Sequence, residues 1–302
     1  MRYLNHMYIY CLSIIMILSC NSESSTQSIN SENNFINDNA LIINHNDQER
    51  EYLIYIPSSY DSTQATPLVL SFHGGSGTAY GYMQYTDMRS VADTAGFLIA
   101  YPQGSLDSEG FSHWNSMLYT EGSKSVVDDV GFIQSLLNDI EDNYNIDTNR
   151  IYASGFSNGA DFSFSLGCYL NSKFAAIVSV SGLMAQESET YCNPISSTGI
   201  MIVHGTSDTE RPYLGINSWY LSIDSAINYW VDYNNLDSTI NLNYVDDNNY
   251  QIENYNYLNS NNKVMIKLLK IINGGHYWFD LEYQNQNLDQ TIWNFFTQHY
   301  KN

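Results

Sequence analysis

Residues 150–159 read RIYASGFSNG, and this stretch decides which fold the chain predicts. An apolar run ends at Gly155, the pentapeptide G-x-S-x-G follows, and residues 160–170 have helical spacing. A strand, this pentapeptide and a helix, in that order, form a nucleophile elbow, a tight turn from which a serine projects. Glycine is expected at both ends because larger side chains would collide there. Ser157 is therefore the candidate nucleophile, and a glycine-rich turn without catalysis is the alternative.

The runs on either side predict a mostly parallel central sheet with helices on both faces, the α/β-hydrolase fold of the α/β class. Residues 237–262, rich in Asn, Asp and Tyr, are expected to form a surface excursion before the last strand. Asp129 is expected to cap the helix at 128–140. Strands are predicted at 52–56, 67–72, 96–101, 150–154, 176–180, 199–203 and 264–270, and helices at 128–140, 160–170, 223–233 and 290–296.

A serine hydroxyl needs a base, and in this fold an acid and then a histidine follow the serine along the chain. His276 is the candidate base because it follows the last predicted strand in a glycine-rich loop. The other histidines lie before the serine, before the best acid or near the chain end. Asp208 is the candidate acid, since it closely follows the strand at 199–203, and Glu210 is its rival.

The oxyanion of a tetrahedral intermediate needs preorganised N–H donors. The amide of Asn158, directly after the nucleophile, is one candidate. Gly75, in the glycine-rich loop after the strand at 67–72, is the other, with Ser76 as the alternative. His73 begins this loop and is expected to be structural rather than a base.

Trp114 and Trp278 are the candidate substrate-binding residues, because an indole can line an acyl or aryl pocket. Packing in the core is the alternative for each. No Cys/His cluster has metal-ligand spacing, and no phosphate-binding glycine motif is present. We therefore expect no metal and no cofactor.

The start of the chain predicts export. Residues 1–19 combine a basic residue, an apolar stretch and a small residue, as in a signal peptide. The run ILSC at 17–20 resembles a bacterial lipobox, which would make Cys20 a lipid anchor; an ordinary signal peptide is the alternative. Residues 20–45 are expected to be a flexible tether and 46–302 a single catalytic domain. The protein is expected at the outer membrane or cell surface, or outside the cell.

Cys168 and Cys192 are the only cysteines in the predicted domain. In an oxidising compartment a disulfide between them is plausible, and two separate buried thiols are the alternative.

The formal net charge is -21, from 11 Lys+Arg against 32 Asp+Glu. Such a surface repels phosphates, which excludes a nucleic-acid partner and leaves the lipid anchor as the expected membrane contact. The charge also argues against strongly anionic polymers as substrates, although a local pocket can override it. We expect a monomer.

Together the motifs resemble the polyhydroxybutyrate depolymerase/feruloyl esterase family of α/β-hydrolases. The resemblance runs from about residue 50 to the end and implies a catalytic triad of Ser157, Asp208 and His276. The family often has a cysteine pair placed like Cys168 and Cys192, which supports the disulfide. The matching stretches are FHGGSG (72–77), WN (114–115), VDDVGF (127–132), RIYASGFSNG (150–159), HGTSD (204–208) and GGH (274–276).

The sequence thus predicts a serine carboxylic-ester hydrolase that acts through an acyl-enzyme. No second, polymer-binding domain is recognisable. This favours feruloyl or acetyl esters of polysaccharide, with short polyhydroxyalkanoate esters also in view. The alternatives are a peptidase of related fold and a catalytically silent glycan-binding lipoprotein.

Overall fold

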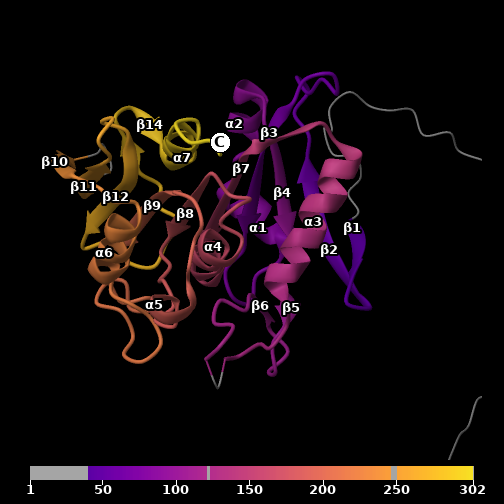
Figure 1. The fold of residues 1–302 in the computed structure, drawn as a ribbon, viewed down its shortest axis with the longest axis horizontal. Coiled ribbons are helices and arrows are strands. Elements are labelled where there is room, and N and C mark those ends of the chain that lie inside the picture. Colours follow the sequence, from indigo (N-terminus) through magenta and orange to yellow (C-terminus); the bar gives the residue numbers. More distant parts are fainter. Residues whose placement is uncertain (1–39, 121–122, 246–249, 302) are drawn as a thin grey trace, which may run out of the picture. The chain divides into compact units, whose positions relative to one another are not determined.

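A ten-stranded sheet organises residues 40–120, 123–245 and 250–301, which the computed structural model describes (Figure 1). Neighbouring strands run parallel from β4 to β12, and the strands added at both edges are antiparallel. In spatial order the strands are β1 (Leu41–His45), β2 (Gln48–Tyr55), β4 (Leu98–Pro102), β3 (Thr66–Phe72), β7 (Ile146–Phe156), β8 (Ala176–Val180), β9 (Gly199–Gly205), β12 (Val264–Ile272), β11 (Gln251–Leu258) and β10 (Ser238–Val245).

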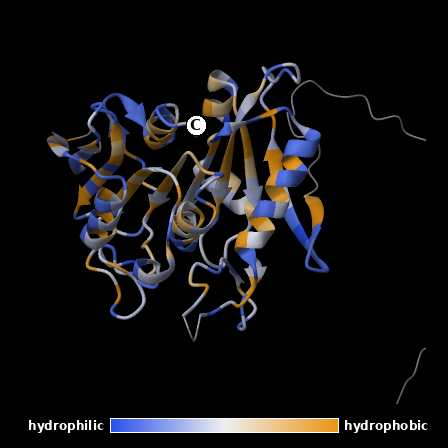
Figure 2. Cartoon of the chain, in the orientation of Figure 1, coloured by the Kyte–Doolittle hydropathy of each residue, from blue (hydrophilic) through white to orange (hydrophobic). Residues whose placement is uncertain are grey.

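Helices cover both faces of this sheet, so the predicted fold is confirmed. Leu68 and Leu70 of β3 join the core under α3, α4 and α6, and Val69 between them joins the core under α1, α2 and α7. Figure 2 shows hydrophobic residues along the central strands, whereas α3 carries both hydrophobic and hydrophilic residues. The helices are α1 (Ala79–Thr86), α2 (Arg89–Ala95), α3 (Asp129–Asn143), α4 (Asn158–Tyr169), α5 (Ser188–Tyr191), α6 (Ile223–Tyr233) and α7 (Leu288–Phe296), and two small ladders pair β5 (Ser105–Leu106) with β6 (Ser112–His113) and β13 (Glu282–Tyr283) with β14 (Gln286–Asn287).

The segment predicted as a surface excursion instead forms two strands, so that prediction is wrong. β10 and β11 pair with each other, and β11 pairs with β12 at the sheet edge. Alternate residues of β11 point inward, and two of them are the buried Asn254 and Asn256. A strand is recognised in a sequence by alternating apolar and polar residues, and an asparagine at an inward position interrupts this pattern. The sequence of β11 therefore did not predict a strand.

The predicted boundary between tether and domain is also wrong. Residues 41–45, assigned to the tether, form β1, which pairs with β2. Leu41 and Ile43 pack against the core, and this burial explains why the chain is ordered there. Residues 1–19 and the proposed anchor Cys20 lie outside the described residues. Among the described residues, no helix is long and apolar enough to cross a membrane.

Asp129 does not cap α3, contrary to the prediction. Asp128 does so, accepting a hydrogen bond from the amide of Gly131 at 2.8 Å. Asp129 points into the core, where one oxygen lies 2.7 Å from the Arg50 guanidinium and the other accepts from the amide of Asn115 at 2.8 Å. A buried carboxylate requires such partners, and here they tie β2 to the loop before α3.

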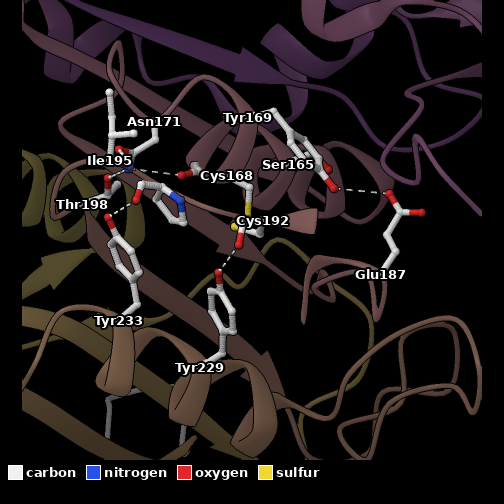
Figure 3. Close-up of a disulfide and its surroundings, with 12 residues drawn as sticks. Ser165, Cys168, Tyr169, Asn171, Glu187, Cys192, Ile195, Thr198, Tyr229 and Tyr233 are labelled. Atoms are coloured by element: carbon white, nitrogen blue, oxygen red, sulfur yellow. Dashed lines mark hydrogen bonds between the residues drawn. A yellow bond between two sulfur atoms is a disulfide. The ribbon is translucent and has the colours of Figure 1, made fainter. Parts of the chain in front are cut away.

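Cys168 of α4 and Cys192 form a disulfide, which confirms the predicted pairing (Figure 3). Their separation is 24 residues. The hydroxyl of Tyr229 on α6 donates to the carbonyl of Cys192 at 3.0 Å. The disulfide therefore fixes the segment between β8 and β9 to the helix that carries the nucleophile turn.

Replacing both cysteines with alanine should lower the free energy of unfolding by about 3 kcal/mol, because the unfolded chain regains the entropy of a closed loop of roughly 25 residues. Urea denaturation of the Cys168→Ala, Cys192→Ala protein measures this change. The wild-type protein unfolded with a reductant should give a similar value. A loss below about 0.5 kcal/mol in both would contradict a stabilising role.

Candidate active site

Ser157 sits at the turn between β7 and α4 with φ 54° and ψ -122°, a backbone conformation that non-glycine residues rarely adopt. A Cβ atom at Gly155 would lie 2.2 Å from the carbonyl oxygen of Gly159, and one at Gly159 would lie 2.3 Å from that of Phe72. Any larger residue at either position would collide with the backbone, so both positions require glycine. The amide of Ser157 donates to the carbonyl of Val180 at 3.0 Å, which fixes the turn to β8.

The three residues predicted as a triad meet at the carboxyl ends of the strands. The Oγ atom of Ser157 lies 2.9 Å from Nε2 of His276, and Nδ1 of His276 lies 2.8 Å from Oδ2 of Asp208. A tautomer with its proton on Nδ1 satisfies both contacts and leaves Nε2 free to accept the serine proton. The arrangement can therefore activate a hydroxyl.

Asp208 is held as an ionised, oriented carboxylate. Its Oδ1 atom accepts from the amides of Glu210 at 2.9 Å and Arg211 at 2.8 Å. Burial by itself would raise the pKa of Asp208, but the hydrogen bonds from His276 and from the Arg211 amide outweigh it and lower the pKa below its usual value. The rival Glu210 has an exposed side chain and contributes only its amide.

Gly75 and Asn158 line one cavity together with Ser157, as the predicted oxyanion hole requires. Within the described part of the chain, neither amide has a protein acceptor. The amide of Ser76, the alternative donor, is already bound to the carbonyl of Ser112 at 2.7 Å. Gly75 and Asn158 are thus the pair that remains available.

Trp114 is fully buried, so its predicted role in substrate binding is wrong. Its ring stacks on Phe162 of α4 with centroids 5.1 Å apart, and its indole N–H donates to the carbonyl of His73 at 3.1 Å. Its main chain forms two hydrogen bonds with the side-chain amide of Asn158, at 2.7 Å and 3.0 Å. Trp114 therefore joins the two segments that carry the oxyanion amides, which a buried aromatic with one polar atom can do.

His73 has structural contacts, as predicted. Its Nε2 atom accepts from the amide of Gly104 at 2.9 Å, and its Nδ1 atom lies 2.7 Å from the carbonyl oxygen of Gly74. Burial lowers the pKa of His73 to about 4, which keeps the ring neutral. The ring thus braces the glycine-rich loop.

Trp278 is half-buried beside the loop that carries His276. Its ring meets Tyr82 edge-on at 6.1 Å, and its amide donates to the hydroxyl of Tyr85 at 3.2 Å. Trp278 does not line either of the cavities that adjoin the glycine-rich loop near Ser157 among the described residues. Its role in substrate binding stays a prediction.

Two of the cavities that the glycine-rich loop lines also include residues of the nucleophile turn. The nucleophile cavity, of about 310 Å³, contains Ser157, and the aromatic cavity, of about 400 Å³, is lined by the loop together with Tyr82, Tyr85 and Phe156. The phenyl ring of Phe156 lies 5.0 Å from the ring of His276. The remaining walls of the nucleophile cavity come from Gly75, Ser76, His113, Met117, Lys124, Asn158, Arg211, Trp219 and Tyr220.

Most of these wall residues were missed at the sequence level. Phe156 and Arg211 had a usable signal, since each lies within three positions of a predicted triad member. Tyr85 on α1, Lys124 and Trp219 had none, because only the folded chain brings these distant segments to the two cavities. No group of three or more His, Cys, Asp or Glu side chains suited to a metal ion occurs among the described residues.

Comparison with known proteins identifies relatives of this chain. A family model described as esterase PHB depolymerase matches residues 50–216. The bifunctional acetylxylan esterase/xylanase XynS20E of Neocallimastix patriciarum is 30% identical over 164 residues, which cover 54% of this chain and 22% of that protein. A probable feruloyl esterase C of Aspergillus flavus is 26% identical over 177 residues, covering 57% and 59%. The chain thus spans less than two thirds of either relative's length.

Solved structures share the fold. The acetyl xylan esterase from Aspergillus awamori matches with a TM-score of 0.59 at 17% identity, over 82% of this chain and 94% of that one. A ferulic acid esterase from Anaeromyces mucronatus matches with a TM-score of 0.55 at 12% identity, over 90% and 93%.

The contact between Trp114 and His73 predicts how Trp114→Phe will behave. We expect kcat for 4-nitrophenyl acetate to fall about tenfold, less than the roughly hundredfold cost of removing an oxyanion donor, because Gly75 is held less firmly. KM should stay within about twofold, since the ring does not touch the cavity. Trp230→Phe is the matched control, because Trp230 is equally buried and its indole nitrogen has no partner within the described structure. A rise in KM with kcat unchanged would restore Trp114 to substrate binding.

Asp289, at the start of α7, predicts a pH dependence of stability. Burial raises its pKa to about 7, while contact with the Trp278 side chain opposes the rise. The folded state therefore binds this proton more tightly than the unfolded state, where an Asp titrates near 4, so the carboxyl's contribution to stability falls as pH rises from about 4 to about 7. The free energy of unfolding of Asp289→Asn, minus that of wild type, should increase across this window and then level off. Urea titrations at pH 5, 6, 7 and 8 measure it; a difference independent of pH would contradict the buried carboxyl.

Proposed function

Because the chain belongs to the esterase PHB depolymerase family, we propose that it is a serine carboxylic-ester hydrolase that acts through an acyl-enzyme. The observation that carries the proposal is the hydrogen-bonded series from Asp208 through His276 to Ser157, beside two amides for which the described structure offers no acceptor. Such a series recurs on unrelated folds wherever a serine is activated for acyl transfer.

In the proposed reaction, Ser157 attacks the carbonyl carbon of the ester while Nε2 of His276 takes the serine proton. The amides of Gly75 and Asn158 donate to the oxygen that becomes negative. His276 then gives its proton to the departing alcohol oxygen, leaving the acyl group on Ser157. Water, activated by the same imidazole, releases the acid, and the carboxylate of Asp208 stabilises the imidazolium at each step.

Acyl groups of the feruloyl or acetyl type on polysaccharide are the proposed substrates, with short polyhydroxyalkanoate esters as the next class. The names of the relatives support this choice. The aromatic cavity supports it independently, since Tyr85 and Phe156 meet edge-on at 5.8 Å and offer apolar walls next to Gly75. An aryl acyl group would bury its ring there.

The proposed setting is outside the cytoplasm. A signal peptide at 1–19, a lipid anchor at Cys20 and a tether ending near residue 40 would leave a single monomeric catalytic domain at the membrane or cell surface. The disulfide between Cys168 and Cys192 supports an oxidising compartment. A peptidase and a silent glycan-binding protein remain the alternatives, and the aligned triad favours an active esterase over the second.

Ser157→Ala should lower kcat for 4-nitrophenyl acetate by at least about a thousandfold, because the variant lacks the hydroxyl that contacts the imidazole of His276. The exposed Ser197→Ala is the matched control and should keep full activity. A fluorophosphonate probe should label wild type and the control and not Ser157→Ala. Circular dichroism verifies that the variant is folded. Unchanged turnover in a folded Ser157→Ala protein would end the proposal, and labelling without ester hydrolysis would point to the peptidase.

A further inference from the structure

The nucleophile cavity has a charge opposite to that of the chain. The sequence carries 32 Asp+Glu against 11 Lys+Arg, yet the described residues that line this cavity include Lys124 and Arg211 and no carboxylate. By contrast, a cavity of about 560 Å³ that Ser76 and Gly77 also line has Glu49 and Glu51 on its walls together with Arg50. Within the described residues, the cavity next to the nucleophile is thus lined by cationic side chains without a carboxylate.

Arg211 is fixed in this wall. Its Nε and Nη2 atoms each lie 3.0 Å from Oδ2 of the buried Asp161, and its Nη1 atom donates to the carbonyl of Glu210 at 3.2 Å. The Asp161 carboxylate raises the pKa of the guanidinium further, so Arg211 stays charged. These contacts leave further N–H groups of the guanidinium for a ligand, since it has five donors. The carboxylate of Asp161 largely balances the charge of Arg211. The guanidinium would therefore orient a ligand through hydrogen bonds more than it would attract one by net charge.

Lys124 supplies a positive charge that interacts with the carboxylate of Asp107 but has no direct ion-pair partner among the described residues. Its side chain is exposed. His113, which also lines the cavity, is neutral: burial lowers its pKa to about 4, and although the carboxylate of Asp107 opposes this shift, Lys124 and Arg211 add to it. An anion in this cavity would therefore meet the Lys124 ammonium, one oriented guanidinium and a neutral imidazole.

Trp219 gives the same cavity a flat apolar wall. Its side chain is 40% exposed, and its backbone is held by hydrogen bonds to Ile216 at 3.0 Å and from Gln186 at 2.8 Å. An exposed indole on a held backbone is a surface on which a sugar ring can pack through its C–H groups. Because the aromatic cavity is suited to an acyl group, the nucleophile cavity is left for the alcohol part of the ester.

We propose that the nucleophile cavity binds an acidic sugar as the alcohol part of the ester, with its carboxylate held by Lys124 and Arg211 and its ring against Trp219. This inference rests on the proposed esterase function and names a substrate class for the same site. It reverses, for this cavity, the expectation that a strongly acidic chain avoids anionic substrates. An ammonium and a guanidinium together recognise a carboxylate through charge-assisted hydrogen bonds.

The test compares a methyl glucuronoside and a methyl glucoside that carry the same acetyl group. Wild type should show a kcat/KM about fivefold higher for the acidic sugar, the size expected for one ion pair at a partly exposed site. Lys124→Gln should remove most of this ratio. Lys173→Gln changes the net charge equally but lies beside Glu141 outside the cavity, and it should keep the ratio. Raising the salt concentration to about 0.5 M should shrink the ratio in wild type, because exposed charges are screened.

A second pair, 4-nitrophenyl acetate and the 4-nitrophenyl monoester of succinic acid, places the carboxylate on the acyl part instead. A Lys124-dependent preference for the succinate ester without one for the acetylated glucuronoside would overturn the assignment of an acidic alcohol. Equal kcat/KM values for the two sugars in wild type, or a ratio unchanged in Lys124→Gln, would also overturn it. Hydrolysis of neither sugar nor 4-nitrophenyl acetate would instead count against the esterase proposal itself.

Discussion

The unusual backbone of Ser157 is the constraint around which the site is built. A φ of 54° at a serine costs of order 1–3 kcal/mol and persists only where surrounding contacts over-determine it. Gly155 and Gly159 leave space for the turn, and the bond from the Ser157 amide to Val180 anchors it to β8. This strained turn places the hydroxyl 2.9 Å from Nε2 of His276, and the amide of Asn158 that follows has no acceptor among the described residues.

A second layer of contacts holds the oxyanion amides without touching the substrate cavity. Trp114 binds the carbonyl of His73 and the side chain of Asn158, so it joins the loops after β3 and β7. The neighbouring Asn115 is held by Asp129, which is paired with Arg50 on β2. Buried polar groups that find hydrogen-bond partners fix the geometry around them. These contacts link the site to β2, although one nitrogen of Arg50, Nη1, is buried without a partner within the described structure.

Global and local charge differ in this molecule. A net charge of -21 governs what approaches from a distance, but within a cavity the few nearest groups dominate. Arg211 has two roles near the nucleophile. Its amide donates to Asp208, and its side chain contributes to the cavity that contains Ser157. The predicted acid of the triad and the proposed anchor for the substrate carboxylate therefore both come from one short turn after β9.

The sequence by itself determined the elements whose signals are local: the buried parallel strands, the glycines around Ser157, the order of serine, acid and histidine, and the cysteine pair. Tertiary structure decided what depends on contacts between distant segments. Trp114 is buried, and Asp128 rather than Asp129 caps α3, because of contacts that form only in the folded chain. Likewise β10 and β11 pair although Asn254 and Asn256 face inward. The tertiary structure also gathered Lys124, Arg211 and Trp219 around one serine. Periodicity and turn chemistry act over a few residues, whereas burial and charge environment exist only once the chain has closed on itself.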